Sequence, residues 1–153
     1  MNVIFLDIDG VLRTHKSDLE WSLKSGLPIP IKVYDRQFGQ KYVSNINYII
    51  SLTGAKIVVS STWRNNFSVE ELKEIFRSRG IFGQIIDKTG IGLTRGEEIQ
   101  EWLDRNEITN YVVIDDQVKD ILSWVNKERV VEVNCQLGFE SDELVDKVLD
   151  ILL

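Results

Sequence analysis

The chain has 153 residues, the length of one ordinary domain, and can bury a core without disulfides. Its 18 Lys and Arg against 24 Asp and Glu leave a net charge of −6, which argues against binding nucleic acid or an anionic membrane through overall charge. The single cysteine, Cys135, excludes an intramolecular disulfide, and no segment approaches the roughly 20 apolar residues of a membrane span, so we expect a cytoplasmic protein.

The predicted elements alternate between short strands rich in Val and Ile and helices with an apolar stripe. In chain order the pattern predicts a strand over 3–6, a helix over 40–53, a strand over 57–59, a helix over 68–80, a strand over 84–86, a helix over 95–103, a strand over 111–114, a helix over 117–125, a strand over 130–133 and a helix over 141–153. The strands show almost no polar alternation, which indicates a parallel sheet covered on both faces. We therefore predict one α/β domain over residues 1–153, with no repeat or linker.

Residue types at the helix ends support these boundaries. Gly54 is expected to end the helix over 40–53, and Ser68 with Glu71 three positions later forms a capping box. Gly80 closes that second helix, and Ser141 is a candidate N-cap for the last one.

Residues 13–39 show no sustained period. An irregular segment of this length in a small domain is usually functional or mobile, so we predict a flap over the site that follows the first strand. The flap carries a local basic cluster of Arg13, His15 and Lys16, in which Arg13 is a candidate substrate-binding residue. A merely solvated His15 is the alternative interpretation.

Acidic and hydroxyl side chains follow several of the predicted strands. In a parallel sheet, ligands bind beyond the carboxyl ends of the strands, so these side chains are expected to meet. Because clustered carboxylates repel one another unless a cation neutralises them, and because all-oxygen ligation favours Mg²⁺, we predict a magnesium site. The residues concerned are Asp7 and Asp9 after the first strand, Ser60 and Ser61 after the second, Asp115 and Asp116 after the fourth, Asp120 four positions later, and Arg95 at a helix start.

This set predicts phosphoryl-transfer chemistry. The Asp7 carboxylate can attack a phosphoryl phosphorus and form an aspartyl-phosphate. Asp9, two residues on, can protonate the leaving oxygen and later activate water. Ser60 or a neighbouring hydroxyl, Ser61 among them, and the Arg95 cation can hold the phosphoryl oxygens.

The segment Asp7-Ile8-Asp9-Gly10-Val11 after an apolar strand resembles the first motif of the haloacid dehalogenase-like (HAD) superfamily. Ser60 resembles the second motif, and Asp116 with Asp120 the fourth. The resemblance implies a Rossmannoid three-layer α/β/α fold with sheet order 3-2-1-4-5. It also implies Mg²⁺ ligation by Asp7, the Asp9 carbonyl and Asp116, with Asp115 or Asp120 in support. The family's third motif is usually a lysine, and Arg95 is the candidate here.

Three strings, over 59–64, 94–103 and 111–116, resemble small HAD domains associated with nucleic-acid repair proteins. That resemblance implies removal of phosphate from RNA ends. The interval between the second motif and residue 94 is consumed by one helix and one strand, so the site is predicted to be essentially capless. An open site suits a polymer end or a protein side chain better than a sequestered metabolite.

Several alternatives stay open at this point. Trp63 and Arg64 either bind a nucleotide or pack in the core with an acidic partner, and Asp120 is either a site residue or solvated. Trp102 and Trp124 are predicted to be core residues. Besides a phosphatase for RNA or DNA ends, the sequence allows a mononucleotide or small-metabolite phosphatase, or a non-catalytic phosphate-binding module.

Overall fold

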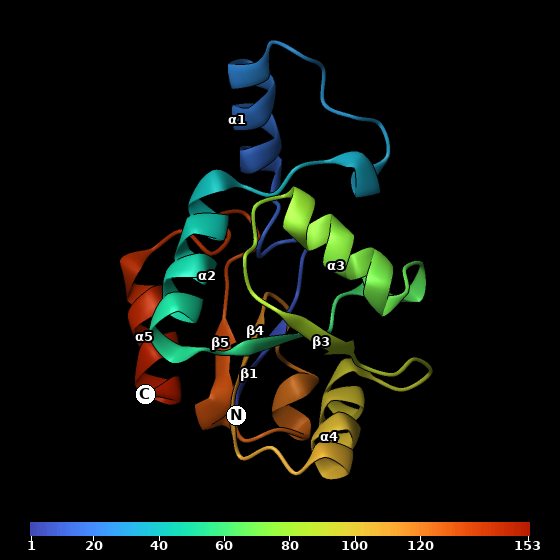
Figure 1. Ribbon diagram of the computed structural model, residues 1–153, viewed down its shortest axis with the longest axis vertical. Helices are drawn as coiled ribbons and strands as arrows, with labels where there is room; N and C mark the ends of the chain where they lie inside the picture. Colours follow the sequence, from blue (N-terminus) through green and yellow to red (C-terminus); the bar gives the residue numbers. More distant parts are fainter.

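Five parallel strands form the centre of the molecule, in the order β3-β2-β1-β4-β5 (Figure 1). The computed structural model describes residues 1–153. The strands are β1 (Asn2–Leu6), β2 (Lys56–Val59), β3 (Ile85–Lys88), β4 (Asn110–Asp115) and β5 (Val130–Glu132). The helices are α1 (His15–Ser25), α2 (Gln40–Thr53), α3 (Val69–Ser78), α4 (Arg95–Asn106) and α5 (Asp142–Leu152). The predicted α/β class and strand order are confirmed.

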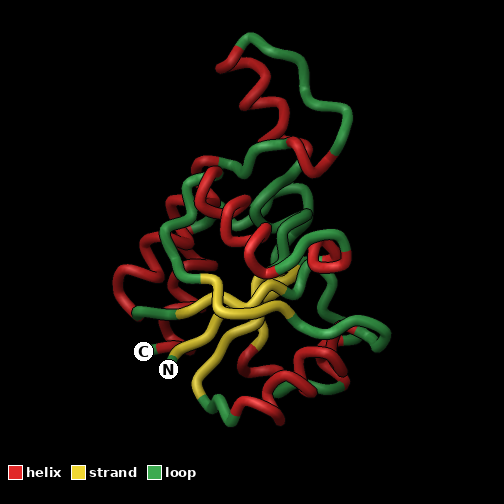
Figure 2. Tube along the Cα trace, turned by 45° about the vertical axis from the view of Figure 1, so that its right-hand side comes forward, coloured by secondary structure: helices red, strands yellow, loops and turns green.

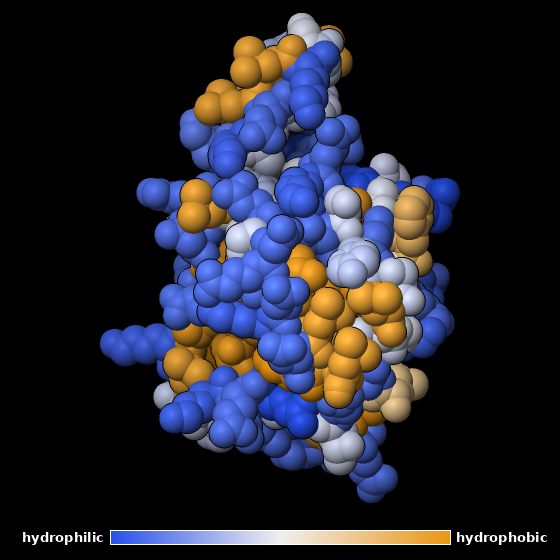
Figure 3. Space-filling model, turned by 90° about the vertical axis from the view of Figure 1, so that its left-hand side faces the viewer, coloured by the Kyte–Doolittle hydropathy of each residue, from blue (hydrophilic) through white to orange (hydrophobic).

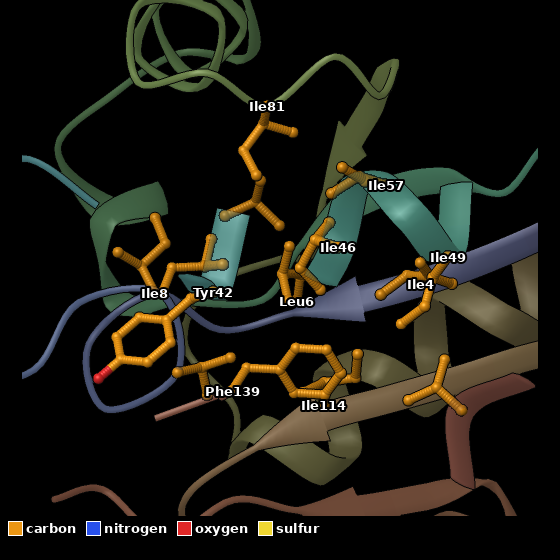
Figure 4. Packing of buried hydrophobic residues seen from close by; sticks show 14 of the residues in the cluster. Ile4, Leu6, Ile8, Tyr42, Ile46, Ile49, Ile57, Ile81, Ile114 and Phe139 are labelled. Carbon is orange, nitrogen blue, oxygen red and sulfur yellow. The ribbon is translucent and has the colours of Figure 1, made fainter. Parts of the chain in front are cut away.

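Helices cover both faces of the sheet (Figure 2). On one face, α2, α3 and α5 enclose a core of 25 buried residues, and on the other α4 closes a core of nine. β1 shows why the strands lack polar alternation: Ile4 and Leu6 belong to the larger core and Val3 and Phe5 to the smaller. Figure 4 shows the larger core around Leu6. Each such side chain contributes on the order of 2 kcal/mol on full burial, so these layers hold the strand ends firmly in register.

The local signals at the helix ends are largely confirmed. Gly54 ends α2 with a φ of 65°, and the Ser68–Glu71 capping box starts α3. Ser141 caps α5 through the Leu144 N–H. α4 continues to Asn106, three residues past its predicted end, and stops where Glu107 takes a left-handed φ of 52°.

Residues 117–125 do not form the predicted α-helix. They contain the short 3-10 turn η3 (Ile121–Ser123) instead. The apolar period that suggested a helix is real, because Val118, Ile121 and Val125 are all buried, but a turn followed by a 3-10 segment buries them equally well. Trp124, predicted to be a core residue, is 49% exposed, whereas Trp102 is buried as expected.

The stretch over 13–39 is not irregular throughout, because it contains α1 and the 3-10 turn η1 (Val33–Asp35). The α1 helix starts at a capping box in which Thr14 and Ser17 bond each other's backbone N–H groups. It buries no apolar side chain and leaves Leu23 85% exposed, which explains why periodicity did not reveal it.

We call residues 13–39 the flap. α1 stands beyond the carboxyl ends of the strands, at the end of the molecule opposite both termini (Figure 1), and Figure 3 shows apolar side chains gathered at this flap end. None of the helices combines the length and apolar character needed to span a membrane.

Candidate active site

Four polar residues lie in a row at the carboxyl edge of the sheet, three of them directly after their strands and Asp115 as the last residue of β4. The register pairs Leu6 with both Val59 and Ile114, and Val59 with Lys88. The residues that follow therefore stand side by side, and because side chains alternate along a strand, they project on the α4 face. Their N–H groups extend the ladder, from Asp7 to the Ile114 carbonyl, Ser60 to that of Leu6 and Thr89 to that of Val59. The resulting row is Thr89, Ser60, Asp7 and Asp115.

Three carboxylates converge at one end of this row. Asp7, Asp115 and Asp116 each place one oxygen within 4.8 Å of the others. Asp7 is 4% exposed and Asp115 fully buried. Burial, followed by the charge of Asp115, raises the pKa of Asp7 well above its ordinary value. Burial also raises the pKa of Asp115, although Arg95 acts in the opposite direction. An all-oxygen cluster that is costly to ionise fits a hard divalent cation such as Mg²⁺.

Arg95 reaches this cluster from the first residue of α4. Its Nη1 donates to Asp115 Oδ2 at 2.8 Å and lies 3.4 Å from Asp7 Oδ2. Burial disfavours the charged guanidinium, but the carboxylates of Asp7 and Asp115 outweigh it and raise the pKa of Arg95. The helix start that carries Arg95 is capped by Thr94 and by Asp120, whose Oδ2 accepts the Gly96 N–H at 2.8 Å. Arg95 therefore places a positive charge in the wall of the cleft, beside the carboxylate cluster.

Asp9 lies beside the cluster, in a tight turn after β1. The turn depends on Gly10, which has a φ of +85° and would place a Cβ 2.4 Å from Asp116 Oδ2. Asp9 Oδ1 accepts from Arg13 Nε at 2.9 Å and Oδ2 from Trp63 Nε1 at 3.0 Å. The Asp9 side chain is still 41% exposed. It is thus held by two donors while facing solvent.

These residues surround a cleft of about 270 Å³. It continues into two open grooves, one of about 940 Å³ that shares Arg95, Asp116 and Gln117, and one of about 490 Å³ that shares His15 and Cys135. Arg13, Thr14 and His15 form its flap side, so the predicted flap does border the site. The full lining is Asp7, Asp9, Gly10, Arg13, Thr14, His15, Thr62, Arg95, Asp116, Gln117 and Cys135.

The two serines after β2 occupy different settings. Ser60 is fully buried next to Asp7 in the row, and its hydroxyl has no hydrogen-bond partner. Thr89, the next residue in the row, has an equally unpartnered hydroxyl. Ser61, predicted as a phosphate ligand, instead accepts the Trp63 N–H at 3.2 Å and caps the 3-10 turn η2 (Thr62–Asn65). The hydroxyl from this segment that lines the cleft belongs to Thr62.

Arg64 and Asp120, both candidate substrate-binding residues, make structural contacts. Arg64 is buried, forms an ion pair with Glu98, and donates to the carbonyls of Ser61 and Gly90. It does not line the cleft, because its contacts with Glu98 and the backbone carbonyls hold its guanidinium beneath the surface. Asp120 caps α4 through the Gly96 N–H and also lines the larger groove, so its role as a substrate contact stays a prediction. Of the two interpretations of Trp63, core packing describes its position, since it is fully buried.

Besides the motif glycine Gly10, five residues that line the cleft were not assigned to it from the sequence: Thr14, His15, Thr62, Gln117 and Cys135. Thr62 and Gln117 directly follow assigned residues, so their position next to a motif was the available signal. Cys135 reaches the rim from the loop after β5, where it is exposed, and no sequence signal distinguished it from a small residue at a strand end. His15, for which a solvated position was the alternative interpretation, is exposed and also borders the cleft.

A family model described as the HAD domain in Swiss Army Knife RNA repair proteins matches residues 3–144. The chain belongs to this HAD family. The match spans all five strands except Asn2, the first residue of β1, and includes every residue of the carboxylate cluster. Comparisons with curated proteins and with solved structures returned no match.

Proposed function

We propose that this HAD domain is a Mg²⁺-dependent phosphomonoesterase that works through an aspartyl-phosphate on Asp7 and acts on the phosphorylated ends of RNA or DNA. One observation carries the proposal: the Asp7 carboxylate meets Asp115, Asp116 and Arg95 at the base of a cleft into which Asp9 also faces. A nucleophile, a proton carrier, an anion clamp and a set of metal ligands are thereby gathered at one sheet edge.

The residues that would hold Mg²⁺ are Asp7, Asp116 and, through its backbone carbonyl, Asp9. When bound, the ion would neutralise the carboxylates and the charge of the phosphoryl oxygens. Asp115 is engaged by Arg95 and by the Gln117 N–H, so it supports the cluster from beneath.

The reaction uses four side chains. An Asp7 oxygen attacks the phosphorus, the bond from phosphorus to the leaving oxygen breaks, and Asp9 gives its proton to that oxygen. In the second half, Asp9 takes a proton from water as the water oxygen attacks the aspartyl-phosphate, which releases phosphate and restores Asp7. The Ser60 hydroxyl and the Arg95 guanidinium can donate to the phosphoryl oxygens throughout.

The openness of the cleft supports a polymeric substrate. It runs into a groove on each side, and α1 stands beside it without covering it as a full cap domain would. The family description, which places such domains in RNA repair proteins, supports a nucleic-acid end over other phosphoesters. The single, exposed Cys135 supports a reducing cytoplasm as its location.

The experiment compares phosphate release from 3′- and 5′-phosphorylated oligonucleotides, mononucleotides and sugar phosphates, with Mg²⁺ or with EDTA. Wild type and Asp7→Asn are compared, and Asp104→Asn, an exposed aspartate on α4, serves as the matched control. We expect turnover that requires both Asp7 and Mg²⁺ and is fastest on an oligonucleotide.

Preference for a mononucleotide over every oligonucleotide would instead support a small-molecule phosphatase. Mg²⁺ binding without turnover on any phosphoester would support a non-catalytic phosphate-binding module. Full activity of Asp7→Asn would exclude the aspartyl-phosphate mechanism.

A further inference from the structure

Each carboxylate oxygen of Asp9 accepts a hydrogen bond from a side chain that belongs to the flap or packs against it. Arg13 Nε donates to Oδ1 and Trp63 Nε1 to Oδ2, so the plane of the carboxylate is fixed by two donors at 2.9 and 3.0 Å. A carboxylate with only one such contact would be free to rotate about its Cβ–Cγ bond. A proton donor must meet the leaving oxygen at hydrogen-bond distance, so this orientation bears directly on its use.

Arg13 connects Asp9 with the start and the end of the flap. Its Nη1 donates to Oδ2 of Asp18, a residue of α1 whose side chain is only 3% exposed. The same Asp18 oxygen accepts from Arg36 Nη1 at 3.2 Å. Arg36 in turn donates through Nε to the Pro30 carbonyl at 2.9 Å. These charged side chains therefore form a continuous chain of contacts. It connects α1 and Arg36, near the end of the flap, with the Asp9 carboxylate.

Trp63, the second donor, is also packed against the flap. The Tyr34 ring lies edge-on to it with centroids 5.0 Å apart, and Phe38 lies at 6.1 Å. Arg79, the residue that follows α3, donates to the carbonyls of Tyr34 and Arg36 in the flap, at 2.7 and 2.9 Å. The flap therefore reaches Asp9 by two separate routes, one ionic and one aromatic.

We infer that Arg13 is a positioning residue: it orients the Asp9 carboxylate for proton transfer to the leaving oxygen, and the flap holds Arg13 in place through Asp18 and Arg36. The inference rests on the proposed function, because it concerns the proton that Asp9 delivers as the phosphorus–oxygen bond breaks. It assigns to the flap a part in catalysis that does not require it to cover the substrate.

A leaving-group comparison separates this role from a merely structural one. An alkyl phosphate, such as a 3′-phosphorylated oligonucleotide, leaves as a strongly basic alkoxide and needs the proton. Acetyl phosphate releases acetate, which leaves without it. Since kcat/KM reports the steps up to phosphoryl transfer, loss of Asp9 orientation should lower kcat/KM for the alkyl substrate far more.

The variants are Arg13→Gln, Arg13→Lys and Trp63→Phe, with Lys24→Gln as the matched control. Lys24 is exposed on α1 and donates to Gln40 at 3.1 Å, so its replacement removes a flap contact that lies outside the network of Arg13, Asp18 and Arg36. We expect Arg13→Gln to lower kcat/KM for the oligonucleotide on the order of 100-fold and for acetyl phosphate less than about tenfold. Arg13→Lys should remain slow, because one ammonium cannot reproduce the fork that reaches both Asp9 and Asp18. Trp63→Phe should show the same dependence on leaving group, and Lys24→Gln should show none.

In Arg13→Gln the buried Asp18 carboxylate loses one of its two cationic partners, which lowers the stability of the fold. The double variant Arg13→Gln/Asp18→Asn removes that buried negative charge and is expected to fold. It should retain the leaving-group dependence. Equal losses on both substrates, or no loss on either, would overturn the positioning role while leaving the proposed function intact. Absence of turnover by the wild type on both substrates would instead overturn the proposed function.

Discussion

Arg95 Nη1 donates to Asp115 Oδ2 at 2.8 Å, and this contact compensates a carboxylate that is fully buried at the end of β4. Removing one partner of a buried ion pair usually costs about 3–5 kcal/mol, because the other charge stays behind. The same guanidinium lies 3.4 Å from Asp7, so its loss affects two acidic groups.

The first prediction is that Arg95→Gln lowers the free energy of unfolding of the metal-free protein by about 3 kcal/mol. Arg95→Lys, which keeps a cation, should lower it by less. Urea unfolding in EDTA measures both. Added Mg²⁺ should recover part of the loss in Arg95→Gln, because the ion supplies charge to the same carboxylates. Equal stability of wild type and Arg95→Gln in EDTA would show that the ion pair does not compensate Asp115.

The pH dependence of stability should report the raised pKa of Asp7. A carboxyl whose pKa is higher in the folded state than in the unfolded state contributes stability fully below its unfolded pKa, and that contribution is lost as pH rises through the folded pKa. The ordinary value is 3.8, so the metal-free wild type should lose this stability as pH rises above that value.

Asp7→Asn removes this titration. We therefore expect the variant to exceed the metal-free wild type in stability at pH 7, because the wild type must either keep Asp7 protonated or bury its charge. The difference should disappear below about pH 4 and reverse when Mg²⁺ is added. A stability difference that does not change between pH 4 and 7 would contradict the raised pKa.

The buried pair of Arg64 and Glu98 predicts a stability effect without a substrate effect. Glu98→Gln should lower the free energy of unfolding by about 3 kcal/mol, because Arg64 loses its charged partner in a site where Glu98 is 1% exposed. Glu97→Gln, on the same helical turn but partly exposed, should cost only a few tenths of a kcal/mol. Neither should change the KM for an oligonucleotide, as Arg64 does not line the cleft. A raised KM in Glu98→Gln would indicate that Arg64 takes part in substrate binding.

The residues at the strand ends could be predicted from the sequence. Asp7 and Ser60 directly follow apolar strands, and Asp115 and Asp116 lie at the end of another. Parallel register brings such positions together, so local pattern predicted the carboxylate cluster. Family resemblance supplied the strand order, which alternation of strands and helices alone does not determine.

The contacts made by the flap could not be predicted from the sequence. α1 buries Ser17 and Asp18 rather than an apolar stripe, so it has no amphipathic signature. The contact between Trp63 and Asp9 joins residues 54 positions apart, and the indole N–H carries no mark in the sequence that tells a hydrogen bond from core packing. Arg64 shows the converse, since an arginine beside a motif suggests function until its burial is known.

Gly10 offers a test of the turn that orients Asp9. Gly10→Ala would adopt an unfavourable φ of +85° and place its Cβ 2.4 Å from Asp116 Oδ2, so Asp116 must move. We expect loss of Mg²⁺ affinity and activity in addition to about 1–2 kcal/mol of backbone strain. Gly26→Ala has a similar φ of +71° but open space around its Cβ, and it should show the strain alone. Calorimetric Mg²⁺ titration distinguishes them, and equal Mg²⁺ affinities would contradict the proposed contact with Asp116.

The unpartnered hydroxyl of Ser60 leads to the last prediction, in which stability and activity change in opposite directions. A buried hydroxyl without a partner costs about 1–3 kcal/mol in the folded state, so Ser60→Ala should leave the free energy of unfolding unchanged or raise it by about 1 kcal/mol. If the hydroxyl donates to the phosphoryl group, the same change should lower kcat/KM on the order of 100-fold.

Thr89→Val is the matched control, because Thr89 is equally buried and unpartnered but lies one strand further from Asp7. It should gain similar stability with activity intact. A Ser60→Ala variant that is less stable yet fully active would show that the hydroxyl serves the fold. The row Thr89, Ser60, Asp7 and Asp115 would then contribute its carboxylates alone to the chemistry of the cleft.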